Sequence, residues 1–277
     1  MAVAAALIPA RTPPPLARKS QLGKARIIGV CLVAFWVLAG VGLGFYLTGG
    51  WNDGYVAKYA PRYVHGIGTT IALVSLSVIL GAVLSVPVAF GRMSKKPVLS
   101  LPASAYVYLL RGTPLISQLF LIYYGLGTFH EQLEAVGLWV FFESAGNCAL
   151  FAFILNTSAY QAEILRGAIE SVSPSQREAA TALGLKGLAT LRKIILPQAL
   201  MVALRPYGNE IILMLKGSAV VGLITVYDIM GETQYAYSHE FDLQFYFWAA
   251  IFYLIIVEVL RNILARLERR LTRHLPR

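Results

Sequence analysis

Charged residues are scarce in this chain. Only 14% of its 277 residues are Asp, Glu, Lys or Arg, whereas 57% are hydrophobic, and the mean hydropathy is +0.63. A soluble domain carries roughly 25% charged residues. This deficit excludes an ordinary soluble core with an anchor and indicates one integral membrane domain.

The residues of catalytic and metal sites are also few. Cys31 and Cys148 are the two cysteines, and both fall in apolar runs with no disulfide or metal spacing. The four histidines show no metal-ligand spacing, and no Gly-rich phosphate loop leads into a Lys-Ser/Thr pair. The sequence therefore predicts a non-enzyme that binds no cofactor of its own and hydrolyses no ATP.

The positive charges are unevenly distributed. A net charge of +10 would suit nucleic acid, but nineteen Lys and Arg residues lie in four polar segments and only two in the other three. The first group is 1–26, 91–97, 166–197 and 261–277, and the second is 49–63, 128–144 and 228–242. Positive charge marks the cytoplasmic ends of membrane spans. We therefore expect contacts with lipid and not with nucleic acid, and both termini in the cytoplasm.

Six apolar stretches are long enough to span a membrane, since about 20 helical residues cross roughly 30 Å of hydrocarbon. They are 27–48, 64–90, 98–127, 145–165, 198–227 and 243–260. The first exceeds the 7–15 apolar residues, roughly, of a signal peptide, so we expect an uncleaved span. The predicted fold is an all-α integral membrane protein of about six transmembrane helices, with 49–63 and 228–242 as external loops.

The third stretch is interrupted by a charged residue, a glycine and a proline, a combination that bends or breaks a helix. The interrupting residues are Arg111, Gly112, Thr113 and Pro114. Two arrangements remain open: residues 98–110 lie along the interface before the span, or one kinked helix runs throughout. For Arg111, an interfacial anchor and a role in subunit packing or the pathway both remain open.

Residues 175–197 form the longest run of mixed polarity between apolar stretches. Glu178 opens a helix-favouring block, Gly184 and Gly187 interrupt it, and a second piece runs until Pro197 stops it. We predict a helix, a glycine turn and a second short helix. Exposed Leu183 and Leu185 would give it a small apolar surface, beside the basic residues Arg177, Lys186, Arg192 and Lys193.

The spacing of this segment resembles the EAA loop of permease subunits of ATP-binding-cassette (ABC) importers. The matching positions are Glu178, Ala179, Ala180, Gly184, Ile194, Leu196 and Pro197. In that family the loop forms coupling helices that sit in a groove of a cytoplasmic ATPase. The RGTP sequence at 111–114, and AYQAEILRGAI at 159–169, resemble the polar amino acid branch of the family.

The resemblance implies a type I importer permease core of five spans over residues 64–265. The extra N-terminal span with its external loop occupies 27–63, and basic cytoplasmic tails occupy 1–26 and 266–277. It also implies an inner-membrane location, a second permease (the same or a related chain), an ATPase dimer carrying ATP and Mg, and an external solute-binding protein. The solute would be a polar amino acid or an opine. A secondary transporter, or a permease for another small polar solute, is the alternative.

The fifth stretch carries ionisable groups, which are costly inside a bilayer and mark functional positions. At 100° per residue, Arg205, Asn209 and Lys216 fall within about 40° of one another, and Glu210 is roughly 100° from Asn209. Asn209, Glu210 and Lys216 are candidates for a wet pathway wall. Structural pairing within the subunit or across a dimer remains the other reading, and Pro206, Gly208 or Gly217 could break the helix.

The charge distribution predicts that residues 166–197 face the cytoplasm and 228–242 the outside. In a background without Cys31 and Cys148, a cysteine at Ser238 should react with an impermeant thiol reagent in intact cells. A cysteine at Ser175 should react only after the cells are opened. The reverse labelling pattern would contradict this topology.

Overall fold

The computed structural model describes residues 23–49 and 52–273. It divides into two compact units, Met1–Trp51 and Asn52–Arg277. Regular structure in the described ranges is helical, without strands. The elements are α1 (Lys24–Gly49), α2 (Asp53–Met93), α3 (Pro97–Gly112), α4 (Leu115–Phe120), η1 (Leu121–Gly125), α5 (His130–Ala135), α6 (Trp139–Phe142), α7 (Ala145–Glu170), α8 (Pro174–Ala182), α9 (Gly187–Thr190), η2 (Leu191–Ile195), α10 (Leu196–Gly217), η3 (Ser218–Ile224), α11 (Ile229–Glu240) and α12 (Gln244–Leu271).

The predicted all-α membrane fold is confirmed. Within the described residues five helices are long and apolar enough to cross a membrane, and six if α3 and the α4–η1 helix count as one broken span. The first unit contributes α1, whose apolar side chains are exposed. Most of the expected basic tail at 1–26, and the last residues of 266–277, lie outside the described residues.

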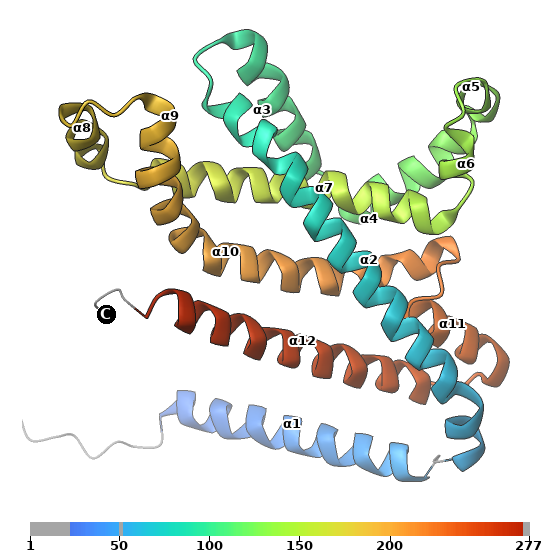
Figure 1. Cartoon of the computed structure of the whole chain (residues 1–277). Coiled ribbons are helices and arrows are strands. Elements are labelled where there is room, and N and C mark those ends of the chain that lie inside the picture. The colour runs from blue at the N-terminus through green and yellow to red at the C-terminus, as the bar shows by residue number, and fades with distance from the viewer. Residues whose placement is uncertain (1–22, 50–51, 274–277) are drawn as a thin grey trace, which may run out of the picture. The chain divides into compact units, whose positions relative to one another are not determined.

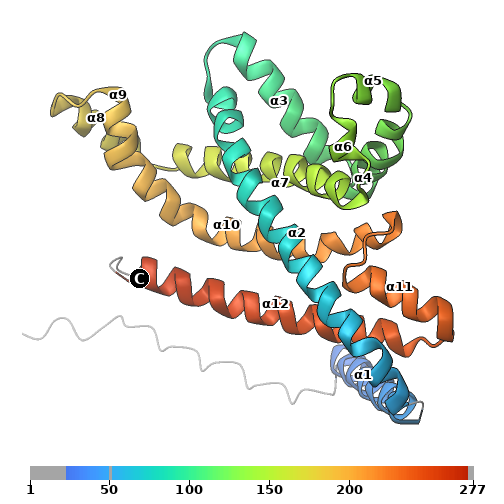
Figure 2. The ribbon, with the colours of Figure 1, turned by 45° about the vertical axis from the view of Figure 1, so that its right-hand side comes forward.

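Helix α2 is the longest element and corrects the expected loop at 49–63. It begins at Asp53, where the Asn52 side chain accepts a hydrogen bond from the Gly54 amide and caps the helix. Its 41 residues extend about 60 Å, far beyond the hydrocarbon thickness. The helix begins beside α11, runs diagonally across α10 and α7, and ends beside α3 (Figures 1 and 2).

Small side chains let α2 approach its neighbours closely. Thr70, Ser77, Ser85 and Ala89 are buried, and the three hydroxyls donate to carbonyls of their own helix. A Cβ on Gly81 would lie 2.5 Å from the Thr157 methyl carbon of α7. Because lipid offers helices no hydrophobic reason to associate, such close packing supplies the attraction. The sequence-based expectation of tight packing along this span is confirmed.

Helix α7 lies at the centre of the second unit. Its buried residues include Ala152, Phe153, Ala159 and Ala162, which join clusters reached by α2, α3 and α10. Phe153 is fully buried. The buried polar residues of α7, such as Asn156 and Thr157, are therefore surrounded by other helices.

The third apolar stretch is broken and not kinked. α3 ends at Gly112, and the chain axis turns by 107° before continuing into α4 and η1. Pro114 causes the break because its ring restricts the preceding residue to an extended conformation, and Thr113 has φ −114° and ψ 146°. A single helix through this region is excluded.

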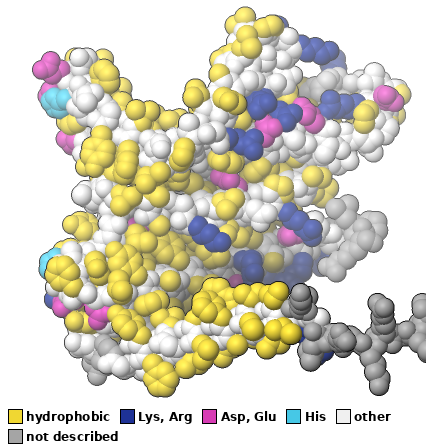
Figure 3. Space-filling model, turned by 180° about the vertical axis from the view of Figure 1, so that it is seen from behind, with side chains coloured by type: hydrophobic (Ala, Val, Ile, Leu, Met, Phe, Trp, Pro, Cys, Tyr) yellow, Lys and Arg dark blue, Asp and Glu magenta, His cyan; other side chains and the backbone are white. Residues whose placement is uncertain are grey.

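After residue 196 the structure decides one open point and corrects one expectation. Pro206 does not break α10, which continues to Gly217 before a 3-10 segment follows. The expected loop at 228–242 is helical as α11, with Asp228 accepting a hydrogen bond from the Gly231 amide as its N-cap. On the face shown in Figure 3, Lys and Arg side chains lie mostly toward the end that carries α8 and α9.

Replacing Gly81 by alanine should lower the stability of the purified protein by about 1–3 kcal/mol, because the new methyl overlaps the Thr157 methyl. Thermal unfolding in detergent measures the effect. Gly68→Ala is the matched control on the same helix, since a Cβ there meets nothing within 4 Å.

Thr157→Ser removes the obstructing methyl and should restore most of the stability lost by Gly81→Ala. If Gly81→Ala and Gly68→Ala unfold at the same temperature, the proposed close approach of α2 and α7 is wrong.

Candidate functional site

The expected helix and glycine turn of the EAA segment are present at α8. The helix begins at Pro174, four residues before Glu178, because a proline is tolerated in the first helical turn. Its end is closed by two hydrogen bonds, from the Gly184 amide to the Thr181 carbonyl (2.9 Å) and from the Leu185 amide to the Ala180 carbonyl (3.0 Å). This pattern is a Schellman motif, which requires a left-handed residue.

Gly184 supplies that residue, with φ of +73°. A side chain there would meet no neighbouring atom, so the position depends on backbone freedom and not on space. The predicted turn between two helices is therefore confirmed, and it lies at the position that the sequence pattern gives its glycine.

The second half of the segment does not stop at Pro197, contrary to the prediction. α9 passes through the π-helical turn η2 directly into α10, where Pro197 is the second residue. A π-helical turn shifts the backbone hydrogen bonds by one residue, and a proline can occupy the first turn that follows. The helical path therefore continues from the segment after the Gly184 turn to the middle of the unit.

The surface of the loop is apolar at its tip and basic around it. Leu183 and Leu188 are 78% and 77% exposed, whereas Leu185 is half-buried, so the second exposed leucine differs from the prediction. The four predicted basic side chains and Glu178 are exposed, and Ala180 is buried. Two leucines within a basic surface form a suitable contact for another protein.

The polar residues of α10 point in two directions. Asn209 and Lys216 are exposed, and neither side chain makes a hydrogen bond or ion pair with the part of the chain that the structure describes. Leu213, which is 62% exposed, lies between them. Arg205 is also exposed and pairs with Glu268 of α12.

Glu210 lies on the other side of the helix and is buried against α7. Its carboxylate accepts a hydrogen bond from the Thr157 hydroxyl (3.0 Å), which also accepts one from the Gln161 amide (3.1 Å). Gln161 in turn donates to the Val78 carbonyl of α2. The structure thus separates Glu210 from Asn209 and Lys216, and Glu210 connects α10 to α7 and α2.

Two amide side chains outside the predicted site residues stabilise the break after α3 by hydrogen bonds. Gln118 donates to the carbonyls of Leu110 (2.8 Å) and Thr113 (3.1 Å). Asn156 of α7 donates to the same Leu110 carbonyl and to the Gln118 side chain (3.0 Å). These bonds satisfy carbonyl groups that a broken helix leaves open. A buried amide in an apolar stretch was the available signal.

A charged cluster lies at the end of α7. Glu163 pairs with Arg166, as the spacing of three residues predicts, and also with Arg92 of α2 at 2.8 Å. Arg166 further pairs with Glu170. The cluster therefore ties α7 to the C-terminal end of α2, which extends to Met93 into the segment 91–97 expected as a loop.

At the other end of α2, ion pairs hold α11. Arg62 Nε lies 2.6 Å from Glu232 Oε2, and the guanidinium stacks on the Tyr235 ring at 3.6 Å from its centroid. Lys58 lies 2.8 Å from Glu240. The hydrogen bond from Lys58 holds the pKa of the Glu240 carboxyl below its ordinary value. The two basic residues of the expected external side are therefore both paired.

Asp228 precedes α11 and is buried. Burial raises its pKa to about 6, against the opposing hydrogen bonds from the Gly231 amide and the Tyr253 hydroxyl. Because a raised pKa disfavours the ionised form in the folded protein, the contribution of this group to stability is greater below about pH 4 and decreases as the pH rises through 6.

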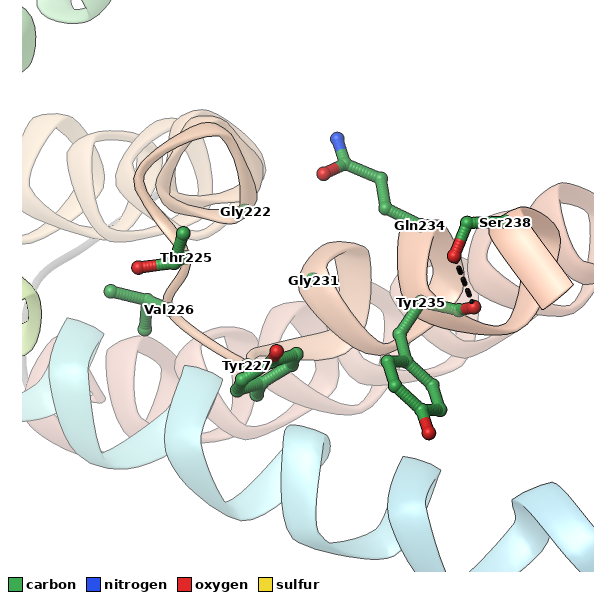
Figure 4. Close-up of a pocket in the computed structure, with 8 residues that line it drawn as sticks. All are labelled: Gly222, Thr225, Val226, Tyr227, Gly231, Gln234, Tyr235 and Ser238. Carbon is green, nitrogen blue, oxygen red and sulfur yellow. Dashed lines mark hydrogen bonds between the residues drawn. The ribbon is translucent and has the colours of Figure 1, made fainter.

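A pocket of about 240 Å³ lies between η3, the linker 225–227 and α11 (Figure 4). Gly222 allows the two segments to approach, since a Cβ there would lie 2.9 Å from the Gly231 amide nitrogen of α11. Thr225, in the left-handed region at φ +65°, and Gln234 add polar groups to its lining. The pocket lies beside α11, which the ion pairs of Lys58 and Arg62 attach to α2. Its lining contains no carboxylate, histidine or cysteine.

The structure combines long apolar helices with an exposed loop that a helical path joins to a polar helix face. This combination is typical of a membrane transport subunit. The chain belongs to the family described as the binding-protein-dependent transport system inner membrane component, whose model matches residues 77–273. The family comprises the permease subunits of ABC importers in bacterial inner membranes, which are not enzymes.

Curated relatives are similar over most of the chain. The nopaline transport system permease protein NocM of Agrobacterium fabrum is 39% identical, over 78% of this chain and 90% of its own length. The histidine/lysine/arginine/ornithine transport system permease protein HisM of Escherichia coli K12 is 38% identical, over 81% and 92% respectively. The octopine transport system permease protein OccM of Rhizobium radiobacter is 38% identical, over 73% and 83%.

Solved structures agree with the fold. The crystal structure of an amino acid ABC transporter with histidines superposes with a TM-score of 0.71 at 33% identity, covering 79% of this chain and 99% of that one. An inward-facing MetNI methionine ABC transporter gives a TM-score of 0.65 at 20% identity, covering 80% and 100%, which supports the fold alone. These likenesses agree with the predicted permease resemblance.

Substituting Gly184 tests the coupling loop. Gly184→Asp and Gly184→Asn carry side chains of equal size that both tolerate a left-handed backbone, so they differ mainly in charge. We expect both variants to insert normally, and Gly184→Asp to lose the ATPase in pull-downs while Gly184→Asn retains most of it.

Equal retention of the ATPase by wild type, Gly184→Asn and Gly184→Asp would show that this turn does not face the partner. The companion charge reversal Glu178→Lys should weaken the same pull-down, because it replaces an exposed carboxylate by a cation on an already basic surface.

Proposed function

We propose that this chain is the transmembrane permease subunit of an ATP-driven importer that carries polar amino acids, or related compounds such as opines, across the inner membrane. The geometry of α8, Gly184 and α9 is the observation that carries the proposal. The solute class is supported by similarity to permeases named for nopaline, octopine and histidine/lysine/arginine/ornithine.

The partners follow from this assignment. The chain pairs with a second permease, either another copy or a related chain, and an external solute-binding protein delivers the solute. An ATPase dimer binds ATP and Mg on the cytoplasmic side, where both termini and the loop 175–197 lie. The concentration of Lys and Arg toward the α8–α9 end supports this orientation.

The helical path gives the loop a means of moving the membrane domain. ATP closes the ATPase pair and brings the coupling loops of the two permeases together. α9, η2 and α10 follow one another without an extended break, and Arg177 of α8 donates to the Ile169 carbonyl near the end of α7. A displacement of α8 is therefore passed to two spanning helices, and the path opens outward.

Asn209 and Lys216 form the polar part of the pathway wall. A charge in a spanning segment needs water, protein or solute around it, and these two side chains lack partners within the described chain. Glu210, in contrast, holds α10 against α7 through Thr157 and keeps the polar face turned away from the unit's interior.

The importer assembled from this chain, its second permease and its ATPase tests the function in proteoliposomes supplied with the binding protein. We expect uptake of at least one of L-arginine, L-histidine, octopine or nopaline that requires internal ATP. Lys216→Ala should reduce uptake at least tenfold with an unchanged yield of complex, because the pathway loses its cation.

Lys95→Ala is the matched control, since it removes one exposed lysine from the loop between α2 and α3. Normal uptake by Lys216→Ala would remove this residue from the pathway. Uptake driven by an ion gradient without the ATPase would instead favour a secondary transporter.

A further inference from the structure

Arg111 is a cation with no ion-pair partner among the described residues. It lies in the last turn of α3, at the break before Pro114. The open carbonyls of that break are satisfied by Gln118 and Asn156, so the break does not need the guanidinium. Arg111 makes no hydrogen bond or ion pair with the described residues, although it stands over the Tyr160 ring, 5.1 Å from the centroid. Its five N–H groups need an acceptor.

The guanidinium lines a pocket of about 320 Å³ between α3, α7 and α10. Tyr160 and Glu163 of α7 contribute to the lining, and Val202 and Pro206 of α10 add apolar surface. Small-molecule sites are of this kind, with volumes of about 300–1,000 Å³ and a few polar groups on mostly apolar walls. The volume therefore suits an amino acid or a compound of similar size.

The two charges of the pocket differ in their state. Glu163 is already balanced by Arg92 and Arg166, whereas Arg111 is not balanced by any carboxylate in ion-pair contact within the described chain. The pocket consequently offers one unsatisfied positive group, with a carboxylate that can still accept a hydrogen bond nearby. This arrangement matches a solute that carries a carboxylate and an ammonium group.

Gly167 leaves free space in the wall of the pocket. Gly167 of α7 belongs to its lining, and a Cβ at this residue would meet nothing within 4 Å. The glycine is therefore not required for helix packing within this unit, unlike Gly81. A larger side chain at 167 would enter free space in the pocket.

We propose that this pocket is a solute site in which Arg111 binds the carboxylate of an amino acid or opine in a bidentate manner, with the solute ammonium directed toward Glu163. Arg fits planar carboxylates in this way. The assignment rests on the proposed import function and gives the RGTP sequence a role in it. A lipid phosphate is also an anion that Arg111 could bind. Comparing solutes with and without a carboxylate, as below, distinguishes a solute site from a lipid site.

Uptake kinetics of the assembled importer test the site with paired probes. The probes are L-arginine, octopine and agmatine, which is arginine without its carboxylate. In Arg111→Gln we expect the KM for L-arginine and octopine to rise roughly 10- to 100-fold, the range for losing a hydrogen-bonded charged contact. Arg111→Lys should fall between wild type and Arg111→Gln. Any agmatine uptake should change less than twofold.

Gly167→Val tests the same pocket without touching a charge. It should lower uptake of L-arginine and octopine at least tenfold, with normal yield of complex and normal basal ATP hydrolysis. Gly68→Val is the matched control, because its Cβ also meets nothing within 4 Å and it lies on α2, outside the pocket lining.

Two results would overturn the site. An unchanged KM in Arg111→Gln together with normal uptake in Gly167→Val would show that solute does not use the pocket. An equal loss for agmatine and L-arginine in Arg111→Gln would show a structural or lipid-related role. A wild-type importer that takes up none of L-arginine, L-histidine, octopine and nopaline would instead contradict the proposed function itself.

Discussion

No water is available inside hydrocarbon to satisfy a backbone group or a charge, and this constraint governs the second unit. Where Pro114 breaks the helix, the carbonyls of Leu110 and Thr113 are taken by Gln118 and Asn156. The Glu210 carboxylate is met by the Thr157 hydroxyl. These two departures from a continuous apolar helix are thus accompanied by polar partners on α4 or α7. That requirement explains why α7, the least apolar of the spanning helices among the described residues, is also the most buried one.

The same constraint divides the polar residues of the core into two groups. Members of the first are satisfied inside the chain and fix helix positions. Members of the second, Arg111, Asn209 and Lys216, make no hydrogen bond or ion pair with the described residues. Since a charge cannot remain unpartnered in lipid at low cost, the second group indicates surfaces that face water, solute or another subunit. These residues indicate functional surfaces because the fold of this chain does not use their polar groups.

Much of the fold could be read from the sequence because membrane spans are encoded by local hydropathy and length. The turn at Gly184 was also readable, since a left-handed cap is a local property. The loops expected at 49–63 and 228–242 were wrong because polar composition was taken for irregular structure. Arg62 and Glu232 pair across 170 positions, and no local pattern reveals that two charged segments stabilise each other as helices.

The side of α10 on which Glu210 lies was equally inaccessible to sequence reasoning. Helical spacing separated it from Asn209 by roughly 100°, but only the position of Thr157 decides which face is covered. The π-helical turn η2 has a consequence for that face. A π turn behaves as one residue inserted into an α-helix, and one residue corresponds to about 100° of rotation. This single inserted residue therefore sets the rotation of α10 about the helix axis relative to α9. It thereby determines which way the polar face of α10 points with respect to the loop 175–197.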